Sequence, residues 1–226
     1  MQPKYLNKLN IFIGPTLHGI GEQVKKTDEN FAWHPPVKRN DIKHLLETHA
    51  PSSVVIVDGY FHNSLAVGHA EIREAIKAGW VIWGVSSMGA IRASEMIPAG
   101  MKGYGLVFKH FANDPDFRDD EVALLHGIKD PYTPVSEPFI HIRYSLDYLL
   151  KNRQITIREK NKIIEILSSI WYGDRTLYYL QELLKSETSF TNEAAINNFI
   201  SDFDRFRIKS TDFINFISKG IWLNNN

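Results

Sequence analysis

The chain of 226 residues contains no cysteine. This absence excludes disulfide frameworks, thiolate metal sites, iron–sulfur clusters and cysteine nucleophiles, and the protein cannot carry a persulfide of its own. The 26 basic and 26 acidic residues cancel, so no overall field attracts nucleic acid or an acidic membrane. No apolar run approaches the roughly 18 residues of a membrane span, and the N-terminal segment lacks the apolar stretch of a signal peptide. We therefore expect a soluble, cytoplasmic protein that binds neither nucleic acid nor membranes.

The first half of the chain alternates short apolar runs with helical patterns. The runs Ile11–Gly14, Val54–Val57 and Val81–Val85 are continuously apolar up to their closing glycine or loop, which is typical of strands covered on both faces. A helical stripe between the last two completes a strand–helix–strand unit. A second such unit is predicted from a short strand at Phe31–Trp33 and a helix after Asn40 that ends near Thr48. The pattern predicts an α/β fold with a Rossmann-like, three-layer, mostly parallel sheet.

The second half of the chain is predicted to be almost wholly helical. From Ser136 onward, apolar residues recur at helical spacing in one stripe around Leu146 and in another around Leu167. Two further helices are predicted at 192–204 and 210–222. These segments predict a helical C-terminal region that follows the sheet and has an apolar core of its own.

The boundary between the two parts is predicted at a proline-rich bend. The bend spans Asp130–Pro134 and follows a candidate strand at Glu121–Leu125. We therefore predict an α/β core of residues 1–135 and a helical region of residues 136–226 that packs on it.

The strand that ends at Val85 runs directly into a predicted helix through two serines. In open α/β sheets the site lies at the carboxyl ends of the strands. Ser86 and Ser87 resemble a nucleophile elbow, although a G-x-S-x-G motif centred on Ser87 requires glycine at Val85, so only Gly89 matches. Two interpretations remain open. In the first, Ser87 is a catalytic nucleophile, and the amides at the start of the helix, including that of Met88, bind an anion above it. In the second, one of the two serines merely caps the helix.

Two other strands end in loops with unusual residues. Asp58 and Gly59 place a carboxylate and an unhindered amide at the expected edge of the sheet, followed by Tyr60. Asp58 is interpreted either as a functional group or as a turn residue that bonds its own backbone. The third loop, after the first strand, is Gly14-Pro15-Thr16. It is too poor in glycine to cradle phosphates, and the chain contains neither G-x-G-x-x-G after a strand nor a Walker A lysine, which disfavours a nucleotide-binding protein.

Two histidines are candidates for proton transfer. His69 shares a helical stripe with Leu65 and Ile72, so it is expected to face the sheet, either as a core histidine or as a catalytic one near Asp58. His126 follows the predicted strand after an acidic run. In a regular strand it faces away from Glu121, so we expect the acidic run to be solvated and predict no metal site.

Arg92 and Glu95 are i, i+3 neighbours on the predicted helix after the elbow. Such a pair is most simply a surface ion pair. The alternative interpretation is an arginine that docks a carboxylate-bearing substrate tail.

A set of short motifs resembles the TfuA family in content, order and spacing. The resemblance covers residues 10–185 and is specific as a set, whereas residues 186–226 carry no family motif. The motifs are Gly14-Pro15-Thr16-Leu17, Asp58-Gly59-Tyr60-Phe61, His69 with Glu71-Ile72, Ser86-Ser87-Met88-Gly89-Ala90 with Arg92-Ala93 and Glu95, Asp119-Asp120-Glu121-Val122 with His126-Gly127, Ser136-Glu137-Pro138 and, more weakly, Tyr172-Gly173-Asp174-Arg175-Thr176.

This resemblance implies a function. TfuA-like proteins act beside YcaO-type ATP-dependent enzymes that convert peptide backbone amides to thioamides, in ribosomal peptide natural products and in a methanogen enzyme. The family is described as enhancing its YcaO partner and as hydrolysing the C-terminal thiocarboxylate of a ThiS-like ubiquitin-fold sulfur carrier, which releases sulfide. The resemblance thus implies a hydrolase of the acyl-transfer type without a cofactor. The absence of cysteine is consistent with this route, since the protein cannot pass sulfur along as its own persulfide.

Acyl transfer assigns roles to the candidate residues. It needs a nucleophile or an activated water, an oxyanion hole and a proton donor for the departing sulfide. Under this hypothesis Ser87 attacks or positions water, and the amides of Met88 and Gly59 stabilise the oxyanion. His126 or His69 handles the proton, with Asp58 as the residue that orients it.

The remaining candidates are assigned to substrate binding. Glycines at positions 14, 59 and 89 leave a slot for a Gly-Gly tail, and Arg92 meets the charge of the tail. The other residues predicted to bind substrate are Pro15, Thr16, Tyr60, Ser86 and Met88. The competing hypothesis is a non-enzymatic accessory protein in which the same loops bind and activate the YcaO partner.

Overall fold

The computed structural model describes residues 8–20, 24, 29–61 and 64–223. The chain divides into two compact units, residues 1–117 with 209–226 and residues 118–208. We call them the sheet unit and the helical unit. This division differs from the predicted domains, because the boundary after residue 135 falls inside the helical unit and the last 18 residues, 209–226, belong to the sheet unit.

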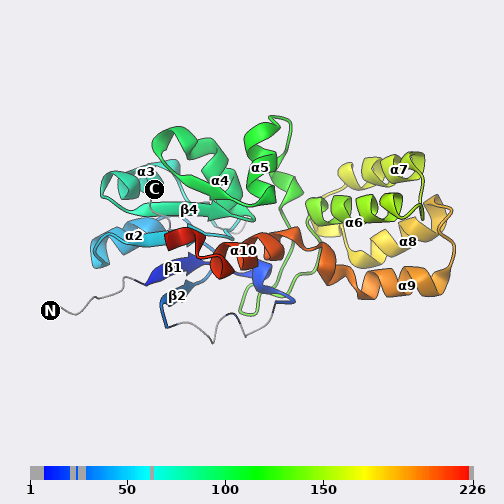
Figure 1. Ribbon diagram of the computed structural model, residues 1–226, viewed down its shortest axis with the longest axis horizontal. Coiled ribbons are helices and arrows are strands. Elements are labelled where there is room, and N and C mark those ends of the chain that lie inside the picture. Colours follow the sequence, from blue (N-terminus) through cyan, green and yellow to red (C-terminus); the bar gives the residue numbers. More distant parts are fainter. Residues whose placement is uncertain (1–7, 21–23, 25–28, 62–63, 224–226) are drawn as a thin grey trace. The chain divides into compact units, whose positions relative to one another are not determined.

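The sheet unit contains one five-stranded, wholly parallel sheet with the order β2-β1-β3-β4-β5 (Figure 1). This confirms the predicted α/β fold with a parallel sheet. Every predicted strand of the first half is present except Glu121–Leu125, and β5 adds a short strand that contains a glycine. The strands are β1 (Leu9–Phe12), β2 (Phe31–His34), β3 (Ser53–Ile56), β4 (Val81–Val85) and β5 (Lys102–Tyr104).

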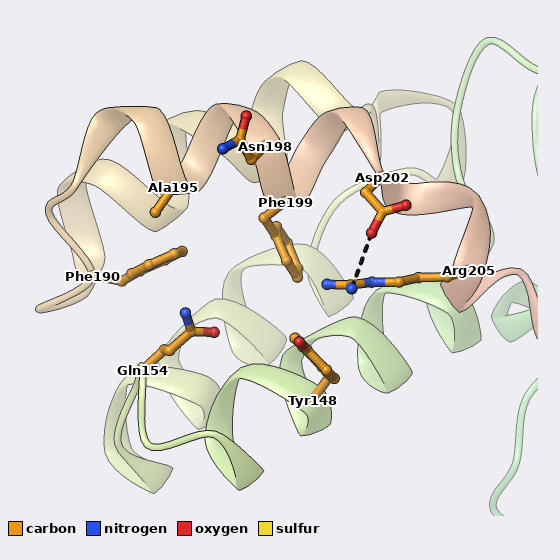
Figure 2. Close-up of a pocket in the computed structure, with 8 residues that line it drawn as sticks. All are labelled: Tyr148, Gln154, Phe190, Ala195, Asn198, Phe199, Asp202 and Arg205. Carbon is orange, nitrogen blue, oxygen red and sulfur yellow. Dashed lines mark ion pairs between the residues drawn. The ribbon is translucent and has the colours of Figure 1, made fainter.

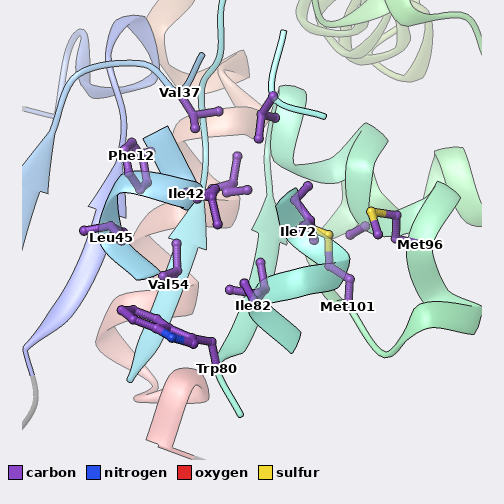
Figure 3. Close-up of a cluster of buried hydrophobic side chains, with 14 of the residues drawn as sticks. Phe12, Val37, Ile42, Leu45, Val54, Ile72, Trp80, Ile82, Met96 and Met101 are labelled. Carbon is purple, nitrogen blue, oxygen red and sulfur yellow. The ribbon is translucent and has the colours of Figure 1, made fainter. Parts of the chain in front are cut away.

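Helices cover both faces of this sheet because its strands are apolar on both sides. In β3, Val54 and Ile56 face one core cluster, whereas Val55 and the following Val57 face another. Figure 3 shows the first cluster, to which α2, α3 and α4 contribute. Phe213 and Phe216 of α10 fill the second cluster. The helices of this unit are α2 (Asp41–Thr48), α3 (His69–Lys77), α4 (Met88–Met96), α5 (Leu106–Asn113) and α10 (Ile208–Ser218), with short 3-10 helices η1 (Pro15–Leu17), η2 (Ile97–Ala99) and η6 (Ile221–Leu223).

The aromatic side chains of α10 explain why the end of the chain belongs to the sheet unit. Phe213 and Phe216 are fully buried, and the ring centroid of Phe216 lies 5.4 Å from that of Trp83 on β4. Burial of two such rings contributes about 1.5–3 kcal/mol each. The predicted helix at 210–222 is therefore present as α10, but it covers the sheet.

The helical unit has its own core. The predicted stripes around Leu146 and Leu167 are buried together with side chains from the following helices. Its helices are α6 (Phe139–Lys151), α7 (Ile157–Ser168), α8 (Leu177–Glu187) and α9 (Glu193–Ser201), with η3 (Asp119–Glu121), η4 (Tyr172–Asp174) and η5 (Phe203–Phe206). All helices in the described part of the chain are too short or too polar to cross a lipid bilayer.

The predicted strand at Glu121–Leu125 is not formed. Glu121 ends the 3-10 helix η3, and its carboxylate receives three hydrogen bonds from the Arg143 guanidinium at 2.8–3.1 Å. The segment is held by this side-chain contact to α6 and, at Leu125, by backbone hydrogen bonds from Val135 and Ser136. The prediction that the acidic run is solvated is also wrong for Glu121, which is buried.

Candidate functional site

The turn from β4 into α4 is abrupt and crowded. Ser86 has a positive φ of 68°, a backbone conformation that residues other than glycine rarely adopt. Two glycines allow the close approach of α4 to the sheet: a Cβ on Gly89 would lie 1.7 Å from the Ile56 carbonyl oxygen, and one on Gly84 would lie 1.9 Å from the Gly89 oxygen. The start of α4 is thereby fixed directly against the end of β3, as in a strand–turn–helix elbow.

The two serines of this turn differ in their contacts. The Ser86 hydroxyl is fully buried and donates a hydrogen bond of 2.7 Å to the Lys209 carbonyl oxygen. Ser87 occupies the N-cap position of α4, but its side chain makes no capping hydrogen bond, and it has no other partner among the described residues. Ser86 thus fixes the turn, whereas the Ser87 hydroxyl is uncommitted. Ser87 is only 2% exposed.

Asp58 links the loops after β3 and β1. Its Oδ2 accepts hydrogen bonds from the amides of Gly14 and Thr16 at 2.8 and 2.9 Å, and its Oδ1 accepts one from the Thr16 hydroxyl at 2.7 Å. Asp58 therefore bonds neither its own turn nor, within the described residues, any histidine. The Asp58 carboxylate is thus held by the loop after β1, and its role in orienting an imidazole stays a prediction.

Gly59 and Met88 bring the other two loops together. A Cβ added to Gly59 would lie 2.7 Å from Met88 Cγ, so glycine is needed for this approach. Within the part of the chain that the structure describes, the amides of Gly59 and Met88 donate no hydrogen bond. Unsatisfied amides at a strand end and at a helix start are suited to bind an anion. These are the two donors predicted for the oxyanion.

The first turn of α10 contacts all three loops. Lys209 lies with its Nζ 3.9 Å from Asp58 Oδ1, and its carbonyl oxygen accepts the Ser86 bond. The Ser210 hydroxyl donates to the Thr16 carbonyl oxygen at 2.7 Å. We call Thr16, Asp58, Ser86, Ser87 and Lys209 the edge cluster. All five are buried at the carboxyl ends of β1, β3 and β4.

Sequence reasoning missed Lys209. The predicted last helix began one residue after it, at 210, and no motif pairs a lysine with an aspartate 151 positions earlier, from 58 to 209. The one signal is that Lys209 lies in the same short stretch as the apolar residues that α10 buries, Ile208 and Phe213.

Asp212 holds another helix start in the sheet unit. Its carboxylate accepts hydrogen bonds from the amides of Leu106 and Val107, at 2.9 and 3.0 Å, at the beginning of α5. Burial raises the pKa of Asp212, although the two amides and nearby cations oppose the shift. The carboxylate fits so closely that a Cβ on Gly105 would lie 2.3 Å from its Cγ.

His69 pairs with a residue outside the edge cluster. It is the first residue of α3, its side chain is 49% exposed, and its Nε2 lies 2.8 Å from Glu95 Oε2. The expectation that His69 faces the sheet is wrong, because α3 starts at this residue and Leu65, four residues earlier, is outside the helix and 71% exposed.

Arg92 contacts the same carboxylate as His69. Its Nη1 donates to Glu95 Oε2 at 2.7 Å, and its Nε donates to the Val67 carbonyl oxygen at 3.0 Å. The i, i+3 pair is therefore formed. Its guanidinium is held by these two acceptors, and docking of a substrate tail stays a prediction.

His126 belongs to the helical unit. Its Nδ1 lies 2.7 Å from the Gly127 carbonyl oxygen, and its ring contacts the Tyr132 ring edge-on at 5.9 Å. Its role in proton transfer stays a prediction. Among the described residues, no three histidine, aspartate or glutamate side chains gather as ligands for a metal ion.

The helical unit contains a buried charge network that the sequence did not reveal. Glu137 lies 3.1 Å from His141 Nδ1 and accepts a hydrogen bond of 2.6 Å from Arg207. Burial alone would raise the pKa of Glu137, but the hydrogen bond and charge of His141, with the charge of Arg207, hold it below its ordinary value. Glu137 belongs to the motif Ser136-Glu137-Pro138, but nothing in the sequence indicates that it pairs with Arg207, 70 residues later.

A cavity of about 270 Å³ opens on the helical unit. Figure 2 shows Arg205 extended across it, paired with Asp202, and its guanidinium lies 4.4 Å from the centre of the Tyr148 ring. None of the predicted site residues lines this cavity. The lining residues are Tyr148, Gln154, Phe190, Ala195, Asn198, Phe199, Asp202 and Arg205.

The fold and the edge cluster together define a class of protein. In a doubly wound sheet of this order, ligands bind outside the carboxyl ends of the strands where the order reverses, here between β1 and β3. Asp58 and Thr16 lie at this switch point. The protein is thus an α/β protein with a buried polar cluster, which includes two serines, at the carboxyl edge of its sheet.

The comparison with known families is specific. The family model described as TfuA-like protein matches residues 58–176, more than half of the chain, and the chain belongs to the TfuA-like family. Membership indicates an association with thioamidation by YcaO-type proteins. A comparison with curated proteins gave no match. The family match starts at Asp58, so the loop Gly14–Thr16 and all of α10 lie outside it.

Proposed function

We propose that this TfuA-like protein hydrolyses the C-terminal thiocarboxylate of a ThiS-like sulfur carrier and so supplies sulfide to a YcaO-type partner. The observation that carries the proposal is the contact between loops at one sheet edge: the uncommitted Ser87 hydroxyl belongs to the residue before Met88, Met88 packs against Gly59, and the amides of Gly59 and Met88 donate no hydrogen bond among the described residues. A nucleophile and oxyanion donors are two of the three elements that acyl transfer requires.

The proposed reaction has two steps. Ser87 Oγ attacks the thiocarboxylate carbon, the amides of Gly59 and Met88 receive the charge that develops on oxygen, and cleavage of the C–S bond leaves an acyl-serine. Water then cleaves the ester and regenerates the hydroxyl. In total, one thiocarboxylate and one water give one carboxylate and one hydrogen sulfide, with both protons of the water on sulfur. The predicted proton carriers, His69 and His126, stay candidates in this scheme.

The strained turn supports Ser87 as the nucleophile. The positive φ of Ser86 and the glycine contacts of α4 fix the direction in which the helix starts. A nucleophile that is held in place avoids the entropic cost of being oriented during the reaction. Ser86 itself is a poorer candidate, because its hydroxyl hydrogen is already donated to Lys209.

One observation favours the non-enzymatic accessory function. Every side chain of the edge cluster is buried, so a carrier tail reaches Ser87 only after covering residues move. A protein that merely binds and activates a YcaO-type partner needs no such access. The two functions differ in whether the isolated protein hydrolyses the carrier thiocarboxylate.

The test measures sulfide release from purified carrier thiocarboxylate without any YcaO-type protein. We expect the wild type to release sulfide and Ser87→Ala to be slower by about 10³-fold or more, as for loss of a serine nucleophile. Ser94→Ala is the matched control, because Ser94 lies on the same helix and bonds only the Ile91 carbonyl oxygen.

Each outcome discriminates between the functions. No sulfide from the wild type would leave the accessory function as the answer. Sulfide release by Ser87→Ala at the wild-type rate would remove Ser87 as nucleophile. Trapping of an acyl-protein with the wild type, and not with Ser87→Ala, would identify the attacked carbon and the oxygen that attacks it.

A further inference from the structure

The proposed reaction starts from an anion and must expel a poor leaving group. A thiocarboxylate is negatively charged at neutral pH, attack by an oxygen nucleophile adds charge, and Asp58 contributes a further negative charge at the same edge. Like charges that lie close together repel each other strongly in a site with little water. Sulfide also departs far more readily when it is protonated. The site therefore needs a cation that can give up a proton.

Lys209 is the cation in the edge cluster. Its side chain is 1% exposed and its Nζ is 3.9 Å from Asp58 Oδ1, which is beyond the 2.7–2.9 Å of a charge-assisted hydrogen bond. The three donors from Gly14 and Thr16 already neutralise part of the Asp58 charge. Asp58 thus attracts the ammonium without receiving a hydrogen bond from it.

Both ends of Lys209 are fixed to loops of the site. Its carbonyl oxygen accepts the Ser86 hydrogen bond next to Ser87, and its Nζ reaches the loop after β3 that contains Gly59. His69 is a poorer donor for this step, because its half-exposed ring is paired with Glu95. Neither α10 nor Lys209 lies within the stretch that the family match covers.

We propose that Lys209 is the general acid of the site: its ammonium pairs with the thiocarboxylate sulfur and transfers a proton to that sulfur as the C–S bond breaks. The proton of the Ser87 hydroxyl passes to the same sulfur, so hydrogen sulfide leaves. The neutral amine then takes the proton that is released when water cleaves the acyl-serine, so Lys209 returns to its starting state. The inference rests on the proposed hydrolysis and names the residue that protonates the sulfide leaving group.

The experiment compares two substrates that differ in the leaving group. One is the carrier thiocarboxylate, whose sulfide needs a proton. The other is a nitrothiophenyl thioester of a short Gly-Gly tail peptide, whose thiolate leaves without one. In Lys209→Gln we expect sulfide release from the thiocarboxylate to fall by about 10²–10⁴-fold, the usual contribution of a general acid, with thioester hydrolysis within a few-fold of wild type.

A second variant separates charge from proton donation. Lys209→Arg keeps the cation, but a guanidinium does not release its proton. We expect this variant to retain the KM for the thiocarboxylate and to lose kcat. Lys102→Met is the control, since the Lys102 ammonium lies over the Trp83 ring at 5.3 Å and takes no part in the edge cluster.

The outcomes are distinct. Parallel loss of both activities in folded Lys209 variants would overturn the proposal and show a structural ion pair, as would wild-type kcat in Lys209→Arg. Unchanged activity on both substrates would overturn it as well. If Lys209→Gln does not fold, the kcat and KM of Lys209→Arg decide. A wild type that cleaves neither substrate is the separate failure of the proposed hydrolysis, and the general acid falls with it.

Discussion

Apart from α6, which follows Pro138 and has no side-chain cap, the helices of the helical unit start differently from those of the sheet unit. In the helical unit the N-cap side chains of α7, α8 and α9 each accept a hydrogen bond from an amide of the first turn. In the sheet unit α2, α3, α4 and α5 start without such a side-chain cap. The N-cap residues that accept such a bond are Thr156, Thr176 and Asn192, and those that do not are Asn40, Gly68, Ser87 and Gly105. Helix amides without local caps are available to distant groups, and the start of α5 binds Asp212 in this way.

Buried charges show the same contrast. In the helical unit, guanidinium groups contact carboxylates at 2.6–2.8 Å, as in Arg175 with Asp120 and Arg207 with Glu137. In the sheet unit, Lys209 and Asp58 remain 3.9 Å apart, although both are buried. Tight pairs with several hydrogen bonds satisfy each other and stabilise a fold. The Lys209 and Asp58 charges face each other without a direct hydrogen bond, and they lie in the same cluster as the uncommitted Ser87 hydroxyl.

The largest effect is expected for Arg175→Met in the helical unit. Arg175 is 1% exposed and donates to the carbonyl oxygens of Leu167 and Asp120 and to the Asp120 carboxylate. Its loss removes the guanidinium from both carbonyl oxygens and leaves the Asp120 carboxylate with Arg118, 3.1 Å away, so we expect the free energy of unfolding to fall by about 3 kcal/mol. Urea unfolding measures the change.

The control for Arg175→Met is Arg205→Met, which removes the partly exposed pair with Asp202. This pair is expected to contribute less than about 1 kcal/mol. Equal stability of the two variants would show that the buried arginine network is not structural and would remove the contrast between the units.

Asp212→Ala is expected to have the next largest effect. It removes the acceptor for the amides of Leu106 and Val107, and an unpaired buried amide costs about 1–3 kcal/mol. Relief of the buried charge offsets part of this, so we expect a loss of about 1–2 kcal/mol in urea unfolding. Faster hydrogen exchange at these two amides locates the effect at α5.

The pH dependence sharpens this second test. Because burial raises the pKa of Asp212 above 3.8, its contribution to stability is greatest at low pH and declines as the pH rises through 3.8 and the higher folded value. The stability difference between wild type and Asp212→Ala should shrink over the same range. The exposed Asp116→Ala serves as control, and a difference independent of pH would contradict the assignment.

Local patterns predicted most of the fold. The apolar run at 81–85 coincides with β4, and the helix predicted after Asn40 and ending near Thr48 is α2, because a buried strand and an amphipathic helix each repeat within a few residues. The strand at Glu121–Leu125 failed for the opposite reason. Its apolar residues resemble a strand, but the pairing of Glu121 with Arg143 fixes the segment, and such a contact has no local period.

The candidate site was predictable only in part. The three loops follow from the rule that parallel strands end at one edge, and Ser86, Ser87 and Asp58 lie there. Lys209 did not follow, because the contact between α10 and the sheet depends on where the chain returns after the helical unit. The placement of His69 depended on the residue at which α3 starts, and helix boundaries are the least regular feature of a sequence pattern.

Thr156→Ala tests the comparison of helix caps between the two units and is expected to change the free energy of unfolding least. Thr156 accepts a hydrogen bond from the Glu159 amide at the start of α7, while Glu159 accepts one from the Thr156 amide. Loss of such a cap costs about 1 kcal/mol, which thermal or urea unfolding resolves. Ser168→Ala, near the other end of α7, is the control.

Ser87→Ala completes this last test, because Ser87 holds the same N-cap position in α4 without a capping bond. Its stability should therefore match that of wild type, even though Thr156→Ala is destabilised. If Ser87→Ala loses as much stability as Thr156→Ala, then Ser87 is an ordinary helix cap and its hydroxyl is committed. The difference between the units, and with it the case for an available nucleophile at the edge cluster, would then disappear.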